Sequence, residues 1–216
     1  MLPTEPYLAQ RGRWPREGRH ILASYDETSI VVYQAYRDSI AEAAVRDQAL
    51  GGGGFAFGRM SWVKPNFLWM MYRCGWATKP DQERVLAVRI RRESFDAMLG
   101  AAVPSAPTPA LDARSWKAAL AGSEVRLQWD PDHHPSGAKL ERRAVQLGLR
   151  GATLMRYATT DVVSIEDVTP FVASQRSSVR TGALEQLLMP RERVYPVSDP
   201  ETARRVGVDG PVGLVV

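Results

Sequence analysis

The stretch DETSIVVYQAYRDSIAEAAV, residues 26–45, decides the fold class because it places a strand and a helix in direct succession. Residues 30–33 form a run of β-branched and aromatic side chains, which predicts a buried strand. Asp38 then stands where a helix cap is expected, and apolar side chains recur on one face of a helix over residues 39–49. The stretch therefore predicts a domain that mixes strands and helices.

Similar patterns recur outward from this stretch. Further strands are predicted at residues 85–90, 125–129, 144–149 and 162–165, and helices at residues 65–74, 94–99, 112–120 and 151–159, with a last turn or helix from Pro170. Five apolar strands separated by helices of uneven length predict an α+β (mixed α/β) domain with one or two small sheets flanked by helices. A doubly wound dinucleotide-binding fold is not expected, because Tyr33-Gln34-Ala35-Tyr36 stands where that fold carries its glycines.

A length of 216 residues favours one domain over two. Residues 1–19 are polar and rich in turn formers, so they are predicted to form an arm. The domain is expected to span residues 20–178, and residues 179–216 are expected to be an appendage because their periodicity is weak. Residues 51–54 are four glycines with no Lys-Ser/Thr pair behind them, which predicts a flexible loop and not a phosphate-binding loop. Residues 101–110 are predicted to be a proline-rich connector.

Composition excludes several classes of protein. Hydrophobic residues make up 44% and charged residues 24% of the chain, as is typical of a globular protein. No apolar run is long enough to cross a membrane or to form a signal peptide, so a cytoplasmic protein without a membrane partner is expected. The single cysteine, Cys74, excludes an internal disulfide. His133 and His134 lie in the turn-like segment DPDHHPSG, where an exposed loop is expected and a metal site is not.

Positive charge is concentrated in two stretches, although the net charge is only +4. Residues 59–92 hold eight Lys and Arg against two acidic residues, with aromatic side chains interleaved. Residues 139–156 add five cations against Glu141. Such stretches can follow a nucleic-acid backbone while their rings stack on bases, or hold a phosphate-bearing cofactor. The alternative is a solvated face whose tryptophans pack in the core.

Six segments resemble a known family: ASYDETSIVVYQAY, RMSWVKPNFLWMMYRCGW, ERVLAVRI, VRLQWDP, RAVQLGL and IEDVTP. Together they resemble the bacterial family called domain of unknown function 4291, from His20 to Gln175. The order of the elements is also similar to that of compact ADP-ribosyltransferases that modify DNA or RNA. In those enzymes a His or Arg on the first strand holds the nicotinamide side of NAD, and a late strand presents a glutamate. This second resemblance implies an ADP-ribosyltransferase-like fold with NAD as substrate.

The same resemblance implies roles for individual residues. Tyr33 and Gln34 end the first strand, where the His or Arg is expected, and the Gln34 amide can hydrogen-bond a carboxamide. Gln146 stands where the glutamate is expected. This is a departure, because a neutral amide cannot stabilise an oxocarbenium-like transition state by its charge. Either Asp130, Glu141 or Glu166 supplies the missing charge, or the fold is kept without transferase activity. Asp130 has the alternative role of stabilising a turn before Pro131.

Cationic and aromatic residues would hold the rest of the ligand. Arg59, Lys64 and Arg73 suit a pyrophosphate or a nucleic-acid backbone, and Trp69 or Tyr72 can stack on a base. The candidate catalytic residues are therefore Gln34, Asp130, Gln146 and Glu166, and the candidate NAD-binding residues are Tyr33, Arg59, Lys64, Trp69, Tyr72, Arg73 and Gln128. All of them except Asp130 and Glu166 are expected to line one concave surface, because polar residues in apolar segments need partners or solvent.

Three functions remain open from the sequence. The first is NAD-dependent transfer of ADP-ribose to nucleic acid or protein. The second is a nucleic-acid-binding module without catalysis, and the third is an enzyme that acts on another phosphorylated small molecule. Binding of NAD with release of nicotinamide would distinguish the first from the second.

Overall fold

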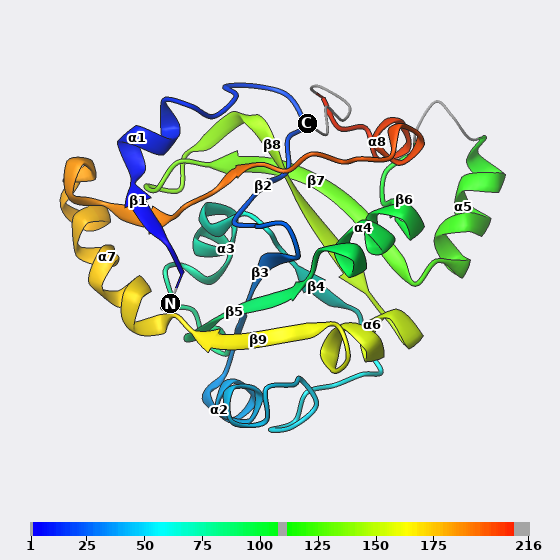
Figure 1. The fold of residues 1–216 in the computed structure, drawn as a ribbon, viewed down its shortest axis with the longest axis horizontal. Coiled ribbons are helices and arrows are strands. Elements are labelled where there is room, and N and C mark those ends of the chain that lie inside the picture. Colours follow the sequence, from blue (N-terminus) through cyan, green and yellow to red (C-terminus); the bar gives the residue numbers. More distant parts are fainter. Residues whose placement is uncertain (1, 108–111, 210–216) are drawn as a thin grey trace.

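Two small sheets face each other across the main core of the computed structural model, which describes residues 2–107 and 112–209 (Figure 1). The three-stranded sheet is antiparallel, in the order β3-β5-β9, and consists of β3 (Ser29–Tyr36), β5 (Arg84–Arg91) and β9 (Val162–Asp167). The four-stranded sheet has the order β4-β8-β7-β6 and consists of β4 (Ser61–Val63), β6 (Val103–Pro104), β7 (Val125–His133) and β8 (Lys139–Leu149). Its β6–β7 pair is parallel and its other pairs are antiparallel.

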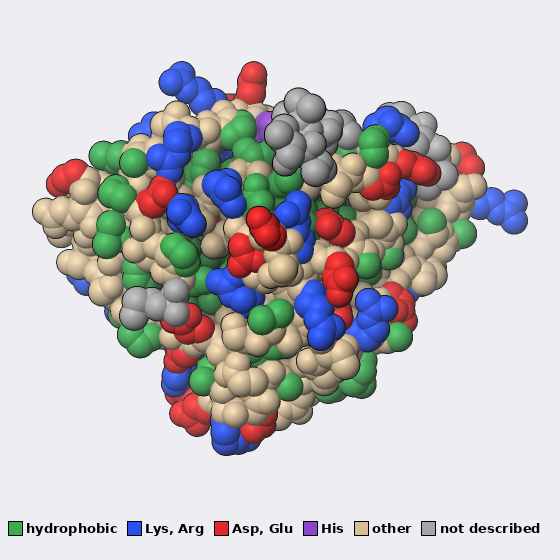
Figure 2. Space-filling view, in the orientation of Figure 1, with side chains coloured by type: hydrophobic (Ala, Val, Ile, Leu, Met, Phe, Trp, Pro, Cys, Tyr) green, Lys and Arg blue, Asp and Glu red, His purple; other side chains and the backbone are tan. Residues whose placement is uncertain are grey.

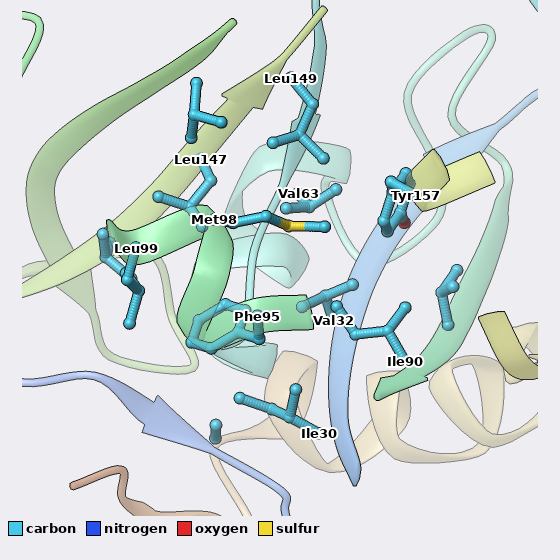
Figure 3. Packing of buried hydrophobic residues seen from close by; sticks show 14 of the residues in the cluster. Ile30, Val32, Val63, Ile90, Phe95, Met98, Leu99, Leu147, Leu149 and Tyr157 are labelled. Carbon is cyan, nitrogen blue, oxygen red and sulfur yellow. The ribbon is translucent and has the colours of Figure 1, made fainter. Parts of the chain in front are cut away.

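Apolar side chains that alternate along the strands fill the space between these sheets (Figure 3). Ile30 and Val32 of β3 belong to the same buried cluster as Leu147 of β8. Helix α4 (Arg92–Ala101) adds Phe95 to this cluster, so it seals the layer between the sheets. Successive residues of a strand point to opposite faces of the sheet. Val31 and Tyr33 of β3 therefore point away from this core.

Helices α3 (Phe67–Cys74) and α7 (Thr169–Thr181) cover that opposite face of the three-stranded sheet. Tyr33 packs there edge-on against Phe67, with their ring centroids 5.4 Å apart. The helix predicted from Pro65 begins later, because the Asn66 side chain accepts the backbone N–H of Trp69 and so caps it. It ends at Gly75, as predicted, with a φ of 60° that favours glycine.

The remaining helices surround these layers. They are α1 (Tyr7–Arg11), α2 (Asp38–Asp47), α5 (Ala113–Gly122), α6 (Gly151–Ala158) and α8 (Pro200–Val206), with a short 3₁₀ turn at Leu184–Gln186. Asp38, expected to cap α2, lies in its first turn and makes an ion pair with Arg84 at 3.1 Å instead. The prediction of a single mixed α+β domain is confirmed.

The two ends of the chain pair with each other and add two more small sheets, so the described residues form four sheets instead of the expected one or two. Strand β1 (Thr4–Pro6) pairs with β10 (Leu188–Pro190), and β2 (Leu22–Ala23) pairs with β11 (Arg193–Val194). Tyr195 is buried in the core between the two main sheets. Tyr7 is buried on the other face of the three-stranded sheet, together with residues of α3 and α7. The described parts of residues 1–19 and 179–216, which were expected to be an arm and an appendage, therefore pack into the core.

Glu192 fixes the C-terminal segment to α3. Its buried carboxylate accepts the backbone N–H of Phe67 at 2.7 Å and the side-chain N–H of Asn66 at 3.3 Å. The indole N–H of Trp14 donates to the backbone carbonyl of Glu192 at 3.0 Å. Burial raises the pKa of Glu192 well above its ordinary value, since a charge there is cut off from water. The N-terminal end of α3 thus depends on residues far away in the sequence.

Strand β7 runs through the turn expected at Asp130-Pro131, with an irregularity in its pairing between Pro131 and His133. His133 is only 2% exposed and stacks on Tyr72, so the prediction of an exposed loop is wrong for this residue. The chain turns just after it, where the backbone N–H of His134 donates to Ala138 at 2.8 Å.

The glycine loop at residues 51–54 is held against α2 instead of standing free. The Ser39 hydroxyl donates to the Gly53 carbonyl at 2.9 Å. A Cβ atom at Gly53 would lie 1.9 Å from the Ser39 carbonyl oxygen, and its φ of 62° lies in the left-handed region. Glycine is therefore required there by close approach of two backbones.

Part of the predicted connector at 101–110 is ordered as β6, whereas its residues 108–110 lie outside the described residues. Within the described ranges, no helix is long and apolar enough to span a membrane. The same residues contain no group of three or more His, Cys, Asp or Glu side chains placed to hold a metal ion.

Candidate functional site

A cavity of about 830 Å³ lies where the end of β3 meets the four-stranded sheet. Its walls come from β3, the start of α2, the glycine loop, β4, α3, the turn at residues 80–82, β7 and β8. Small-molecule sites commonly have volumes of about 300 to 1,000 Å³, so a cofactor-sized ligand fits.

Seven of the nine residues expected on one concave surface line this cavity. They are Gln34, Arg59, Lys64, Trp69, Arg73, Gln128 and Gln146. They come from segments more than a hundred positions apart, and the two sheets and α3 bring them together. Their joint position is confirmed, while their chemical roles stay predictions.

Tyr33 and Tyr72 do not line the cavity. Tyr33 points to the opposite face of the three-stranded sheet, where burial raises the pKa of its hydroxyl well above the ordinary value. Tyr72 lies on the outer side of α3 and stacks on His133, with 3.5 Å between the ring centroids and an interplanar angle of 9°. Both are corrections, because the alternation along β3 and the helical phase of α3 turn these rings away.

Gln34 is buried, and both the nitrogen and the oxygen of its amide already have hydrogen-bond partners. Its Nε2 donates to the Ser61 hydroxyl at 2.8 Å and to the Trp62 carbonyl at 3.2 Å. Its Oε1 accepts the Tyr157 hydroxyl at 2.6 Å. These bonds join β3, β4 and α6, so Gln34 shapes the wall of the cavity, and a ligand would have to displace one of its partners to bind the amide.

Lys64 is 5% exposed and has few polar neighbours. Its Nζ donates to the Trp62 carbonyl at 3.3 Å and lies 4.9 Å from the centre of the Trp69 ring. Burial, aided by the positive charge of Arg73, lowers the pKa of Lys64 to about 7, and the opposite effect of Asp130 is smaller. Near neutral pH a much larger share of this amine is therefore neutral than of an exposed lysine.

Two tryptophans form apolar walls beside Lys64. Trp69 is buried, and its indole N–H has no acceptor within the described part of the chain. Trp62 packs over Gly148, where a Cβ atom would come within 3.0 Å of the indole ring. Trp62 was not predicted as a site residue. The alternation of side chains along a strand could have predicted it. Because Val63 is buried on one side of the chain, Trp62 and Lys64 lie together on the other side.

Asp130 is held between two glutamines on the four-stranded sheet. Gln128 and Gln146 are directly opposite each other in the β7–β8 register, and both line the cavity. The Gln128 amide donates to Asp130 Oδ1 at 2.7 Å, and the Gln146 amide donates to Oδ2 at 2.6 Å. Asp130, one of the carboxylates predicted to supply the missing charge, thus accepts a hydrogen bond from Gln146, which stands where the resemblance implies a glutamate.

Glu166 lies on the other side of the three-stranded sheet. In the register of that sheet, Glu166 is opposite Ala87, and Ala87 is opposite Tyr33. Residues paired across strands share a face, so Glu166 is on the face of Tyr33 and away from that of Gln34. Its negative charge acts on the pKa of Tyr33, which agrees with this placement. The structure therefore separates Glu166 from the cavity; Glu141 is exposed on β8 and also does not line it.

Three exposed arginines line the cavity: Arg37, Arg59 and Arg73. Arg73 donates to the Gln82 side chain at 3.3 Å. Among the described residues, no carboxylate lies within 4.0 Å of any of these three guanidinium groups. Arg37 was missed by sequence reasoning, because it follows β3 with no motif around it. Guanidinium groups in this arrangement suit a phosphate-bearing ligand.

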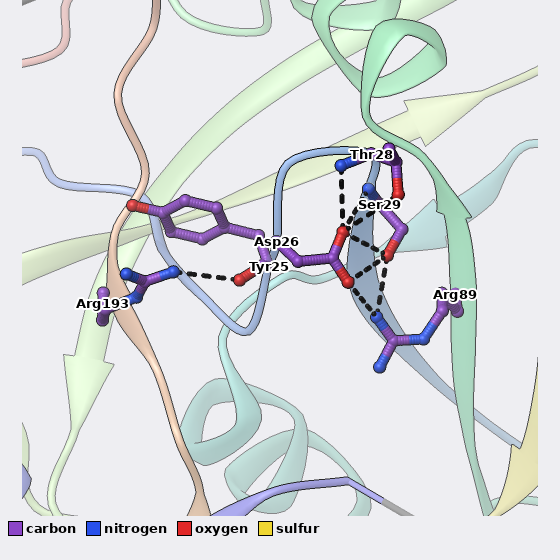
Figure 4. Close-up of polar contacts among 6 residues, drawn as sticks. All are labelled: Tyr25, Asp26, Thr28, Ser29, Arg89 and Arg193. Carbon is purple, nitrogen blue, oxygen red and sulfur yellow. Dashed lines mark hydrogen bonds and ion pairs between the residues drawn. The ribbon is translucent and has the colours of Figure 1, made fainter. Parts of the chain in front are cut away.

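Other arginines of the basic stretch at 59–92 are engaged elsewhere. Arg84 pairs with Asp38 and Asp167. Arg89 donates to the Ser29 hydroxyl at 2.8 Å and to Asp26 at 3.3 Å (Figure 4). These ion pairs neutralise part of the positive charge that the sequence concentrates in residues 59–92.

A second cavity of about 890 Å³ lies beside Asp26 and Arg89. It is lined by Arg91 and Arg92 but also by Glu93 and Asp96. In Figure 2, acidic and basic side chains are intermingled on the face shown there, without one continuous basic patch. This mixture of signs does not favour an extended anion at that face.

The family model of Domain of unknown function (DUF4291) matches residues 20–195. The chain belongs to the DUF4291 family. The matched range contains every residue that lines the first cavity, so the cavity is built entirely from the DUF4291 part of the chain. No curated protein matches the chain.

Proposed function

We propose that the first cavity binds a phosphorylated ligand that carries an aromatic base, and that the chain uses it to transfer ADP-ribose from NAD to nucleic acid. The observation that supports this proposal is the convergence in one cavity of exposed arginines, two tryptophans and two glutamines, both of which hydrogen-bond the Asp130 carboxylate behind them. Guanidinium groups bind a diphosphate, and indole rings stack on a base or on nicotinamide. The order of the elements expected from the sequence, which resembles that of compact ADP-ribosyltransferases, is consistent with this proposal.

Each residue then has a defined task. Arg59 and Arg73 bind the diphosphate, and Trp69 packs against a ring of the ligand. In the transfer step the bond between a ribosyl carbon of NAD and the nicotinamide nitrogen breaks, with the bonding pair leaving on nicotinamide. A nucleophilic atom of the acceptor nucleic acid forms the new bond to that carbon and gives up its proton to solvent. The Asp130 carboxylate provides the negative charge that stabilises positive charge developing on the sugar, and Gln146 helps to hold that carboxylate in place.

Nicotinamide release by Asp130→Asn tests this assignment. We expect the variant to lose release by a factor of about 100 or more, as is common when one electrostatic stabiliser is removed, with a Tm within a few degrees of the wild type. Binding of NAD, measured by calorimetry, should be weakened much less. DNA, RNA and protein acceptors are supplied in parallel so that the acceptor class is identified.

Glu166→Gln is the matched control, because it removes one carboxylate from the other face of the sheet. It should release nicotinamide at the wild-type rate per folded molecule. Loss of release in Glu166→Gln with normal release in Asp130→Asn would show that the assignment is wrong. Absence of NAD binding to the wild type would refute the proposed function itself.

The second candidate is a nucleic-acid-binding module without catalysis. It is favoured by the same exposed arginines, which have no carboxylate within ion-pairing distance in the described structure. If six or more phosphates are contacted, affinity should fall by roughly a thousandfold between 50 and 200 mM salt. A salt-sensitive interaction without NAD binding would support this module. Competition of NAD by ATP or a sugar phosphate would instead point to another phosphorylated small molecule. We propose a cytoplasmic location, where such ligands are found.

A further inference from the structure

Lys64 differs from the other lysines of the chain. Four of the 28 basic residues are lysines, and all four are in the described part of the structure. Lys79, Lys117 and Lys139 are exposed, whereas Lys64 is 5% exposed and lines the cavity. A buried ammonium without an ion pair costs several kcal/mol, and a hydrocarbon side chain at this position would avoid that cost. The amine therefore needs an explanation beyond packing.

The surroundings of Lys64 hold the amine in place and favour its neutral form. The backbone is fixed by two hydrogen bonds with Tyr33, of 2.7 and 3.3 Å, where the extended segment meets β3. No carboxylate lies within 4.0 Å of Nζ among the described residues. The charged and titratable groups that act on it are Arg73 and Cys74 of α3 and Asp130 of β7, and burial outweighs them all. A neutral amine has a free electron pair and is a nucleophile.

The cavity offers that amine a specific class of partner. Arg59 and Arg73 line it with guanidinium groups, which suit a phosphate, and the walls formed by Trp62 and Trp69 are apolar. We propose that Lys64 is a nucleophilic amine that condenses with the carbonyl carbon of a phosphorylated aldehyde bound in this cavity. This inference stands on Lys64 and the cavity, and it does not depend on transfer of ADP-ribose.

The reaction is a reversible condensation. The Nζ electron pair forms a bond to the carbonyl carbon while the carbon–oxygen π pair moves to oxygen, and transfer of one proton from nitrogen to this oxygen gives a carbinolamine. The hydroxyl then takes a second proton from solvent and leaves as water with the carbon–oxygen bonding pair, while the nitrogen electron pair forms a double bond to carbon. The product is an iminium ion, and added borohydride can reduce it by hydride transfer to a stable secondary amine on Lys64.

Trapping with pyridoxal 5′-phosphate and borohydride tests the proposal on the folded full-length chain. At pH 7 the neutral fraction of an amine with a pKa of about 7 exceeds that of an ordinary lysine by about a thousandfold, and lower basicity offsets only part of this advantage. We expect peptide mass spectrometry to find the adduct on Lys64 at least about tenfold more often than on Lys79, Lys117 or Lys139. Labelling of the three exposed lysines alone would overturn the proposal.

Two controls address recognition and folding. Pyridoxal, which lacks the phosphate, should show a several-fold smaller preference for Lys64 over the three exposed lysines than its phosphate ester does, and inorganic phosphate should slow labelling of Lys64 by the ester. Labelling after denaturation should lose its preference for Lys64, whereas an unchanged preference would refute a role for the cavity. Lys64→Arg keeps a cation but not the nucleophile, so it should lose the adduct while its circular dichroism matches the wild type.

The outcome can be separated from that of the proposed function. A Lys64 adduct without NAD binding supports the reactive amine and refutes transfer of ADP-ribose. NAD binding and nicotinamide release without a Lys64 adduct refute the reactive amine only. If ADP-ribose, whose free ribose opens to an aldehyde, is also trapped on Lys64, the two activities share one ligand.

Discussion

At the scale of single residues, Lys64 should make stability depend on pH. Between its lowered pKa of about 7 and the ordinary value of 10.5, the unfolded chain carries a proton that the folded chain has lost. The free energy of unfolding therefore rises with pH across this window, by up to about 1.4 kcal/mol per pH unit. The variant Lys64→Met has no titrating group at this position. Relative to this variant, the free energy of unfolding of the wild type should rise by roughly 3 kcal/mol from pH 7 to pH 10. Chemical denaturation at several pH values measures the difference.

Lys79→Met is the matched control, because Lys79 is exposed. Its stability should run parallel to that of the wild type over the same range. Parallel curves for Lys64→Met and the wild type would mean that the amine of Lys64 titrates as it does in water. Buried tyrosines with raised pKa values destabilise the folded state at high pH, and they do so equally in the wild type and in both variants. The difference in stability between each variant and the wild type is therefore free of this effect.

At the scale of elements, the glycine loop and the two residues that follow it form one wall of the cavity, which is lined there by Gly54, Phe55 and Ala56. Gly53→Ala would place a methyl group 1.9 Å from the Ser39 carbonyl oxygen in a left-handed backbone conformation. We expect a loss of at least about 2 kcal/mol in the free energy of unfolding, together with weaker ligand binding. Thermal denaturation and calorimetry measure the two effects.

Gly58→Ala is the corresponding control on the same connection. A Cβ atom at Gly58 meets nothing within 4 Å, and its φ is outside the left-handed region. This substitution should change stability by less than about 0.5 kcal/mol. Equal effects of the two substitutions would contradict a tight contact between the loop and α2.

At the scale of the whole molecule, the C-terminal segment is part of the core. Tyr195 is 1% exposed, packs edge-on against Phe95 at 5.3 Å and donates to Asp96 at 2.6 Å. Tyr195→Ala should reduce the free energy of unfolding by roughly 3 to 5 kcal/mol, as is usual for removing a buried aromatic ring. A chain that ends at Gly182 should lose cooperative unfolding altogether, because it also lacks the carboxylate of Glu192 at the start of α3.

Leu188→Ser is the control in the same segment, because this side chain is exposed and its backbone keeps the β1–β10 pairing. It should change stability by less than about 0.5 kcal/mol. A shortened chain that unfolds cooperatively with normal stability would restore the interpretation of this segment as an appendage.

The sequence by itself determined those features that depend on neighbours along the chain. The strand around Val32 and the stop of α3 at Gly75 followed from apolar alternation and from the backbone freedom of glycine. The gathering of Lys64, Trp69 and Gln146 was also predicted, because polar groups in apolar segments need a shared cavity or solvent.

Only the tertiary structure decided which of these residues can act together. Gln34 and Tyr33 are adjacent in sequence, yet the pleat of β3 sends one toward the cavity and the other away from it. Asp130 and Glu166 were both candidates from the sequence, and only the β7–β8 register shows that Asp130 is the one hydrogen-bonded to Gln146. Lys64 is buried by residues from distant segments of the chain. Burial and pairing across sheets are set by contacts between residues far apart in sequence, and no local pattern contains that information.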